Sequence, residues 1–432
     1  MSMTRDLDTR SVAERDRKHV WHPWSPVTDA GPGHPVIVSG RGYRVRDQDG
    51  VEYLDATAGA MNASCGFAHP ALLGAVSEQM ARLPHVDLSN NTHPQAGAVA
   101  ERLAGLLPTG LDRTLLLNSG SEATEAAVRI VQDHWTHVGR RRDRIITLTA
   151  GYHGSTLVAQ HLSGMASNRI YGAAPFPVTR VDLPLTGAAL RTAEGRDALG
   201  QAFAEAIADG DPPAAVFLEP LLNVGGGIVL PAGFLSRLRA LCDDSGALLV
   251  VDEVFCGFGR TGRMFGFEHD GVAPDVVTTS KGLSGGYVPF AAVTTTDAVF
   301  RGFATDPILG GLRYGHTTGG HAVACAVALA VLDTIEGEGL VESARVLGAE
   351  LLARLEPLAA QAEVADVRGL GLVVTVQAHE EAFAAGVVGR LRADGVLVRR
   401  QGTAIMAIPP LIIDRTGIEE LARAVERSVA AA

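Results

Sequence analysis

The sequence predicts an α/β fold with a large, mostly parallel central sheet and a smaller α/β domain. Short apolar segments of strand length recur through the middle of the chain and alternate with segments of helical periodicity. Strands that are apolar throughout belong to parallel sheets covered on both faces. The 432 residues, 47% of them hydrophobic, are enough for a large core and for two or three domains.

The composition argues against several classes of protein. A net charge of −11 gives no general attraction to nucleic acid or to an anionic membrane, so a small molecule is the expected partner. The cysteines are widely spaced and form no Cys-x-x-Cys pair, which indicates buried thiols and neither a zinc site nor a disulfide framework. Residues 1–8 lack the apolar core of a signal peptide, and no apolar run is long enough to span a bilayer, so we expect a cytoplasmic protein.

The N-terminal part of the chain is predicted to form a helix, an antiparallel meander and two further helices. A charged helical segment at 10–19 precedes the tryptophan-rich segment 21–24. These tryptophans form either a hydrophobic clamp for the N-terminus or a wall of a substrate pocket. Alternating residues at 35–54 predict the meander, as part of the smaller domain. Helical periodicity follows at 70–83 and 95–107.

The segment 114–131 predicts a strand, a turn of small residues and the start of a helix. The turn contains Ser119, Gly120 and Ser121, and its hydroxyl groups can cap the helix. Backbone N–H groups at the positive end of a helix can hold a phosphate. An ordinary structural turn is the alternative, because many strand-to-helix turns look alike.

Three later strands end beside residues that can carry chemistry. Apolar runs, the last of them at 276–279, lead to Glu219, Asp252 and Lys281. Right-handed crossovers bring the carboxyl ends of parallel strands to one edge of a sheet, so we expect these side chains to lie along the same edge. A solvated loop position is the alternative for Asp252.

Lysine is rare in this chain, because only Lys18 and Lys281 among the 37 basic residues are lysines. Arginine stays protonated, whereas a partly desolvated lysine amine can lose its proton and form a Schiff base with a carbonyl. Lys18 lies in a charged segment, where a solvated side chain is expected. For Lys281 the alternative is compositional drift that spared one lysine by chance.

Taken together, these motifs resemble those of the class III aminotransferases, which are fold-type I pyridoxal-phosphate enzymes. The most specific match runs from Asp252 in Asp-Glu-Val-Phe-Cys-Gly-Phe-Gly-Arg-Thr-Gly to Lys281. Segments 118–123 and 151–154 match the family's cofactor loops, and the resemblance covers nearly the whole chain. It implies a large cofactor-binding domain and a smaller domain built from both termini, at residues 76–325 and at residues 1–75 plus 326–432.

The resemblance also implies a role for each site residue, with Lys281, Asp252 and Tyr152 as the catalytic residues. Lys281 would bind pyridoxal 5'-phosphate covalently and carry protons, and Asp252 would keep the ring nitrogen of the cofactor protonated. Tyr152 and Val254 would press on the two faces of the ring. Thr317 would contact the phosphate of the neighbouring subunit's cofactor, which implies a homodimer. Further cofactor contacts are expected from Ser119, Gly120, Ser121, His153 and Glu219.

The expected substrate contacts depart from the subfamily that the N-terminus resembles. Trp24 and Arg399 are similar to substrate-pocket residues of the diaminopelargonic acid aminotransferases of biotin synthesis. That subfamily has a tryptophan pair where this chain has Ala60 and Met61. It also has an aspartate where this chain has Ser155, so an aromatic wall and a carboxylate are missing.

The glutamate-using branch of the family is also a poor match. Val224 replaces its switch glutamate and Met406 replaces its carboxylate-binding arginine, and neither side chain can pair with a carboxylate. Arg399 and Arg400 remain as carboxylate contacts, with solvated or structural roles as the alternative. We therefore expect pyruvate to be a better acceptor than 2-oxoglutarate.

These observations lead us to expect transamination between a primary amine or ω-amino compound and an oxo acid. An aminomutase or an amino-acid racemase would use the same apparatus, and a diaminopelargonic acid aminotransferase is a further alternative. A non-catalytic cofactor-binding or assembly protein is the third possibility. The presence of Lys281, Asp252 and Tyr152 argues against it.

Overall fold

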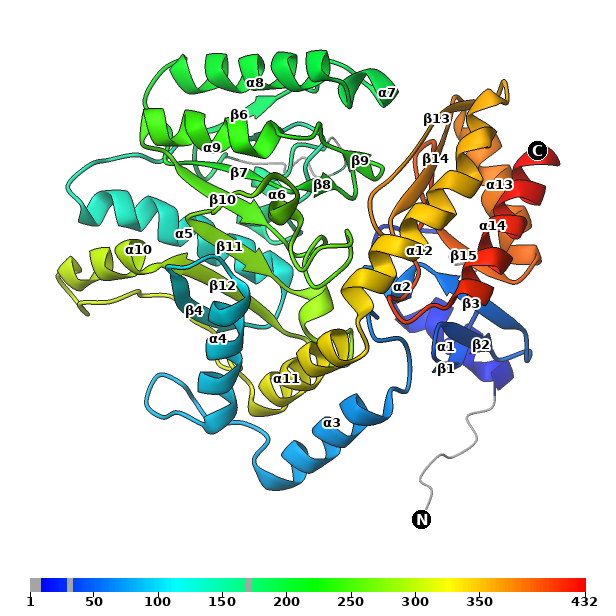
Figure 1. Ribbon diagram of the computed structural model, residues 1–432. Helices are drawn as coiled ribbons and strands as arrows, with labels where there is room; N and C mark the ends of the chain where they lie inside the picture. Colours follow the sequence, from blue (N-terminus) through cyan, green and yellow to red (C-terminus); the bar gives the residue numbers. More distant parts are fainter. Residues whose placement is uncertain (1–8, 29–33, 166, 168–172) are drawn as a thin grey trace.

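The computed structural model describes residues 9–28, 34–165, 167 and 173–432. Residues 1–8, on which the signal-peptide expectation rests, lie outside the described residues. Within the described part of the chain, two sheets of seven strands each form the centres of a larger and a smaller domain (Figure 1). Both of the expected domains are therefore present.

The larger domain is built on a mostly parallel sheet, as predicted. From edge to edge its strands are β4 (Leu111–Leu117), β12 (Ala291–Thr296), β11 (Val276–Thr279), β10 (Leu248–Asp252), β7 (Ala215–Leu218), β5 (Ile145–Leu148) and β6 (Val178–Val181). Neighbouring strands pair in parallel, except that β12 is antiparallel to both of its neighbours. The strands β7, β10 and β11 therefore end at the same edge of the sheet.

Helices cover both faces of this sheet because successive side chains of each apolar strand point to opposite faces. Val250 and Val276 pack with α5 (Gly120–His137) on one face. Val251 and Val277 pack on the other face, which α8 (Ala193–Ala208) and α9 (Phe234–Ser245) cover. Below the sheet in Figure 1, α11 (Ala322–Gly337) packs against the two helices predicted from periodicity, which are α3 (Pro70–Arg82) and α4 (Pro94–Leu106).

The sheet of the smaller domain joins the two ends of the chain. Its strands run in the order β1 (Ile37–Arg41), β2 (Arg44–Asp47), β3 (Glu52–Ala56), β15 (Val396–Gln401), β16 (Ala404–Ala407), β14 (Val374–Ala378) and β13 (Val364–Gly369). The first three form the predicted antiparallel meander, and β3 pairs in parallel with β15. The blue and red ends of the chain consequently lie together in Figure 1, beside α12 (Leu340–Leu355), α13 (Glu381–Ala393) and α14 (Arg415–Ala430).

The sequence positions at which the domains change stay predictions. The predicted limit after residue 325 falls inside α11, which packs on α3 and α4 of the larger domain. Because α11 ends at Gly337, we propose that the C-terminal part of the smaller domain begins after this residue. The remaining elements are α1 (Thr9–His19), α2 (Ala58–Met61), α6 (Leu157–Leu162), α7 (Gly187–Leu190), β8 (Leu221–Leu222), β9 (Ile228–Val229), α10 (Asp297–Gly302) and the short helices η2 (Gly266–Asp270), η3 (Lys281–Leu283), η4 (Phe303–Thr305) and η5 (Glu356–Ala360).

Two further expectations concern membranes and thiols. Among the described helices, none combines the length and the apolar composition that crossing a membrane requires. The cysteines at 65, 242, 256 and 325 are buried free thiols, as predicted.

Candidate active site

A cavity of about 150 Å³ lies at the edge of the large sheet where β7, β10 and β11 end. Its wall includes the acids and the lysine that follow these strands, and the turn that opens α5. The predicted residues that line it are Ser119, Gly120, Ser121, Tyr152, His153, Glu219, Asp252, Val254 and Lys281. Strand ends and helix starts that are far apart in the sequence thus meet at one site.

Lys281 begins η3 directly after β11 and Ser280, so its amine enters the cavity from a strand end. Its φ angle of 30° lies in the left-handed region that residues with a Cβ rarely adopt. Desolvation lowers the pKa of the Lys281 amine, against the opposing effect of the carboxylates of Asp252 and Glu219. A lowered pKa increases the share of the neutral amine, which is the nucleophilic form.

The carboxylate of Asp252 is buried and held by three hydrogen bonds. Its Oδ2 lies 2.8 Å from Nδ1 of His153, and its Oδ1 accepts from the Val254 N–H and the Thr278 hydroxyl, both at 3.1 Å. The other ring nitrogen of His153 lies 3.2 Å from the hydroxyl of Thr147. Because the imidazole is bonded on both sides, it fixes the position of the carboxylate it contacts.

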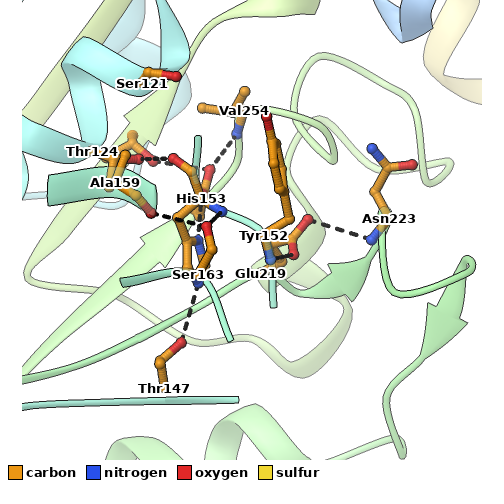
Figure 2. A network of polar contacts seen from close by, with 12 residues as sticks. Ser121, Thr124, Thr147, Tyr152, His153, Ala159, Ser163, Glu219, Asn223 and Val254 are labelled. Carbon is orange, nitrogen blue, oxygen red and sulfur yellow. Dashed lines mark hydrogen bonds and ion pairs between the residues drawn. The ribbon is translucent and has the colours of Figure 1, made fainter. Parts of the chain in front are cut away.

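Glu219 supports the backbone that carries Tyr152. Its Oε1 accepts from the Tyr152 N–H at 3.0 Å and its Oε2 accepts from the Asn223 N–H at 3.4 Å (Figure 2). Burial raises the pKa of Glu219 to about 7, and the neighbouring His153 opposes this rise. The network in Figure 2 thus positions both Tyr152 and His153 at the cavity.

The turn before α5 presents the positive end of that helix to the cavity. Ser119 caps α5, accepting a backbone N–H bond from the first turn at 3.2 Å. A Cβ at Gly120 would lie 2.9 Å from Cγ1 of Val254, so only glycine leaves this space open. The hydroxyl of Ser121 accepts from the Ser155 N–H at 3.0 Å. This arrangement is suited to an anion such as a phosphate.

These residues fit the pyridoxal phosphate that the sequence led us to expect. The N-terminus of α5 can receive its phosphate and the buried carboxylate of Asp252 can pair with its ring nitrogen. The amine of Lys281, with its lowered pKa, can bind its aldehyde. Tyr152 and Val254 both line the space between these groups.

Trp24 lies against Tyr152, which is a residue of the cavity wall. The two rings meet edge to face with their centroids 6.5 Å apart, and Trp24 is 65% exposed. A hydrophobic clamp would bury this ring, so the contact favours a pocket wall.

The structure distinguishes Arg399 from Arg400, for which the sequence left open a carboxylate contact or a solvated or structural role. Arg399 is partly buried, and its positive charge contributes to the lowered pKa of Lys281. Its Nη2 donates to Gln401 at 3.4 Å, but its buried Nε has no hydrogen-bond partner among the described residues. Arg400 is exposed, donates to a backbone carbonyl at 2.9 Å and lies 3.6 Å from Glu381. Arg399 is therefore the better placed of the two to receive a substrate carboxylate.

Three other predicted positions lie away from the cavity wall. Thr317 is exposed, and its predicted contact with a neighbouring subunit stays a prediction. Met406 is buried and pairs with Arg399 across β15 and β16. Val224 is partly buried in the loop between β8 and β9. Apolar side chains thus occupy the positions where the glutamate-using branch has its switch glutamate and its carboxylate-binding arginine.

Gly154 also lines the cavity and belongs to the segment 151–154, which resembles a cofactor loop. Three other residues of the cavity wall escaped prediction: Asn223, Phe255 and Ser280. Each of them follows or precedes a predicted site residue within a few positions. Closeness to a strand end is therefore the sequence signal that could have identified them.

Known proteins resemble this chain over nearly its whole length. A family described as Aminotransferase class-III matches residues 28–429. The adenosylmethionine-8-amino-7-oxononanoate aminotransferase of Geobacter sulfurreducens is 33% identical, with 98% of each chain covered. The taurine–pyruvate aminotransferase of Rhodobacter capsulatus is 35% identical, covering 98% of this chain and 97% of the other. The solved (S)-enantioselective ω-transaminase of Thermomicrobium roseum has a TM-score of 0.92 at 31% identity, covering 98% of this chain and 99% of the other.

Proposed function

We propose, from the premise that this chain belongs to the class III aminotransferases, that it transfers an amino group from a primary amine or ω-amino compound to a small oxo acid such as pyruvate. The family depends on pyridoxal phosphate and is a family of enzymes, so a non-catalytic role is set aside. The observation that carries the proposal is the cavity in which Lys281, Asp252 and Tyr152 meet the N-terminus of α5.

Pyridoxal phosphate, when bound, supplies an electron sink that weakens the C–H bond beside the transferred amino group. Lys281 would take that proton from the substrate carbon and would return it on the other side of the transferred nitrogen, since its lowered pKa makes the neutral amine available. Asp252, fixed by His153, would hold a proton on the ring nitrogen. Tyr152 and Val254 would confine the ring and exclude water from its faces.

The choice of a small oxo acid rests on Arg399. Its Nε is buried and has no acceptor within the described part of the chain, so a carboxylate can satisfy it, and such charge-assisted bonds are strong. An enzyme that accepts both glutamate and a plain amine has to neutralise such a charge when the amine binds. Val224 and Met406 cannot do so, which favours pyruvate over 2-oxoglutarate. The Rhodobacter capsulatus relative, which has pyruvate in its name, supports the same choice.

We also propose that the enzyme works as a homodimer in which the exposed Thr317 reaches the phosphate of the neighbouring subunit's cofactor. This follows the family resemblance, and the exposure of Thr317 is compatible with it. A cytoplasmic location stays a prediction from the sequence.

The Geobacter sulfurreducens relative supports a second candidate, an 8-amino-7-oxononanoate aminotransferase. Ser155 argues against this candidate, because its hydroxyl bonds to the Tyr152 hydroxyl at 2.9 Å at the position where the resembled subfamily has an aspartate. Ala60 and Met61, in place of a tryptophan pair, argue against it as well. A third candidate, an aminomutase or racemase, would use the same catalytic residues.

A half-reaction experiment distinguishes these functions. The purified holoenzyme is mixed with a panel of amines, and the absorbance of the cofactor and the released carbonyl product are followed together. We expect one carbonyl product per cofactor aminated, and faster recovery of the original spectrum with pyruvate than with 2-oxoglutarate. Isomerisation without a carbonyl product would establish the aminomutase or racemase instead. Recovery that is faster with 2-oxoglutarate would refute the acceptor choice, and turnover only with 8-amino-7-oxononanoate would establish the second candidate.

A further inference from the structure

Four consecutive residues of α2 have left-handed backbone conformations. The φ angles of Ala58, Gly59, Ala60 and Met61 are 46°, 56°, 78° and 67°. Only Gly59 lacks the Cβ that makes this conformation unfavourable, and residues with a Cβ normally adopt it singly. We call residues 58–61 the left-handed turn. Such strain persists only where the surrounding structure imposes it, and it gathers at functional sites.

Asp55 binds the segment that enters the left-handed turn with both oxygens of its carboxylate. This side chain lies near the end of β3 and is only 2% exposed. Its Oδ1 accepts from the Thr57 N–H at 2.9 Å and from the Thr57 hydroxyl at 2.6 Å, and its Oδ2 accepts from the Gly59 N–H at 2.8 Å. A buried carboxylate with three donors on one short segment restricts the backbone of that segment.

The left-handed turn leaves the small sheet beside the candidate substrate contact. Ala56, the last residue of β3, pairs with Val398, which directly precedes Arg399. Met61, at the other end of the turn, is buried in an apolar cluster with Phe255 and Met406. Phe255 lines the cavity that contains Lys281, and Met406 faces Arg399 across two strands. Met61 therefore packs with a residue of the cavity wall and with the strand partner of Arg399.

We propose that Asp55 is a positioning residue that holds the left-handed turn and thereby places Met61 in the wall of the substrate pocket. Without the carboxylate, Ala58 and Ala60 would relax toward the right-handed conformation and withdraw Met61 from its cluster. Asp55 then determines how large an amine the pocket accepts. This readout rests on the proposed aminotransferase function.

The first test is Asp55→Asn, which keeps the size of the side chain but replaces one carboxylate oxygen by an amide NH2 group. A single oxygen is then left to accept from the two donors of Thr57 and from the Gly59 N–H. The preference for a small over a bulky amine, as a ratio of kcat/KM values, should fall by about tenfold, which is the range expected for lost hydrogen bonds to a charged group. The change should lie mainly in KM, with kcat for the small amine nearly unchanged. Thr57→Val, which removes only the hydroxyl bond, should produce a smaller change in the same direction. If Asp55→Asn does not fold, Thr57→Val provides the test in its place.

A second substitution separates positioning from general stability. Glycine adopts positive φ angles without the Cβ clash, so Ala60→Gly added to Asp55→Asn should restore most of the size preference. Ala68→Gly is the matched control, because Ala68 is exposed and has a φ angle of 54° outside the left-handed turn. It relieves the same kind of strain and should restore nothing.

Hydrogen exchange at the Gly59 N–H supplies a readout that needs no transamination. We expect slow exchange in the wild type and at least tenfold faster exchange in Asp55→Asn, since the exchanging N–H loses its buried acceptor. An unchanged size preference and unchanged exchange, or equal rescue by Ala60→Gly and Ala68→Gly, would overturn the proposal. A wild-type protein that transaminates no amine would defeat the proposed function, while the exchange experiment would still test the role of Asp55.

Discussion

Replacing Asp252 by asparagine should slow the transfer of the amino group by about a thousandfold while the fold is retained. Asparagine keeps the shape of a buried side chain that contacts His153 at 2.8 Å and accepts from Val254 and Thr278 at 3.1 Å. It removes the negative charge that would hold a proton on the ring nitrogen of the cofactor. Two unit charges about 4 Å apart in a partly desolvated site interact by about 4 kcal/mol, and this corresponds to a rate factor of about a thousand.

The rate is best measured in a single turnover, in which the absorbance of the bound cofactor is followed after mixing with an accepted amine. Glu253→Gln is the matched control, since Glu253 is the adjacent buried acid and accepts from the Gly266 and Phe267 N–H groups at 2.9 Å. Burial raises the pKa of Glu253 to about 8, so an uncharged amide should alter the rate only a few-fold. A near-normal rate for Asp252→Asn, or equal losses in both variants, would refute the reasoning.

Three further predictions concern the lysine, the arginine and the buried glutamate. Lys281→Ala should abolish turnover but leave a folded protein that binds the cofactor without a covalent bond; borohydride reduction of the native enzyme should label the Lys281 peptide, and a label on Lys18 would contradict the assignment. Arg399→Met should raise the KM for pyruvate by roughly 10- to 100-fold, as expected for a charged hydrogen bond of about 1.5–3 kcal/mol, whereas Arg400→Met should change it little; equal effects in a steady-state assay would remove Arg399 from this role. Burial raises the pKa of Glu219 from 4.5 to about 7, so its contribution to stability is fully present below pH 4.5 and is lost as the pH rises through about 7. In Glu219→Gln the decline in the free energy of unfolding over this window should be smaller by roughly 3 kcal/mol in urea titrations, and an identical decline in both proteins would contradict the shift.

The strands that carry the site were predictable because their signals are local. Residues 276–279 are β-branched throughout and form β11 with the predicted bounds, and Lys281 follows one residue later. Asp252 ends β10 for the same reason, since an uninterrupted apolar run favours a strand buried on both faces. Parallel pairing then brings both side chains to one cavity, so most of the candidate site could be predicted before the structure was known.

The parts that escaped prediction depend on contacts between distant segments. Local propensity favours the right-handed helix at Ala58 and Ala60, but the buried Asp55 and the packing of Met61 impose the opposite conformation. Likewise, the reversed direction of β12 follows from its pairing with β4 and β11, and nothing in its own residues predicts it. Tertiary contacts of this kind override local preference, and a sequence pattern does not contain them.

The pairing of β3 with β15 has a consequence for the synthesis of the protein on the ribosome. Leu54 emerges early, but its partner Val396 is among the last residues to be made. Until then one side of the N-terminal meander presents unsatisfied N–H and C=O groups, which can pair with a strand of another nascent chain. A premature stop codon between Lys281 and β15 would still permit translation of Lys281 and Asp252. The first effect of such a truncation on the cell would be an aggregating polypeptide. The protein quality-control system would act on this product before the metabolic flux through the enzyme declined.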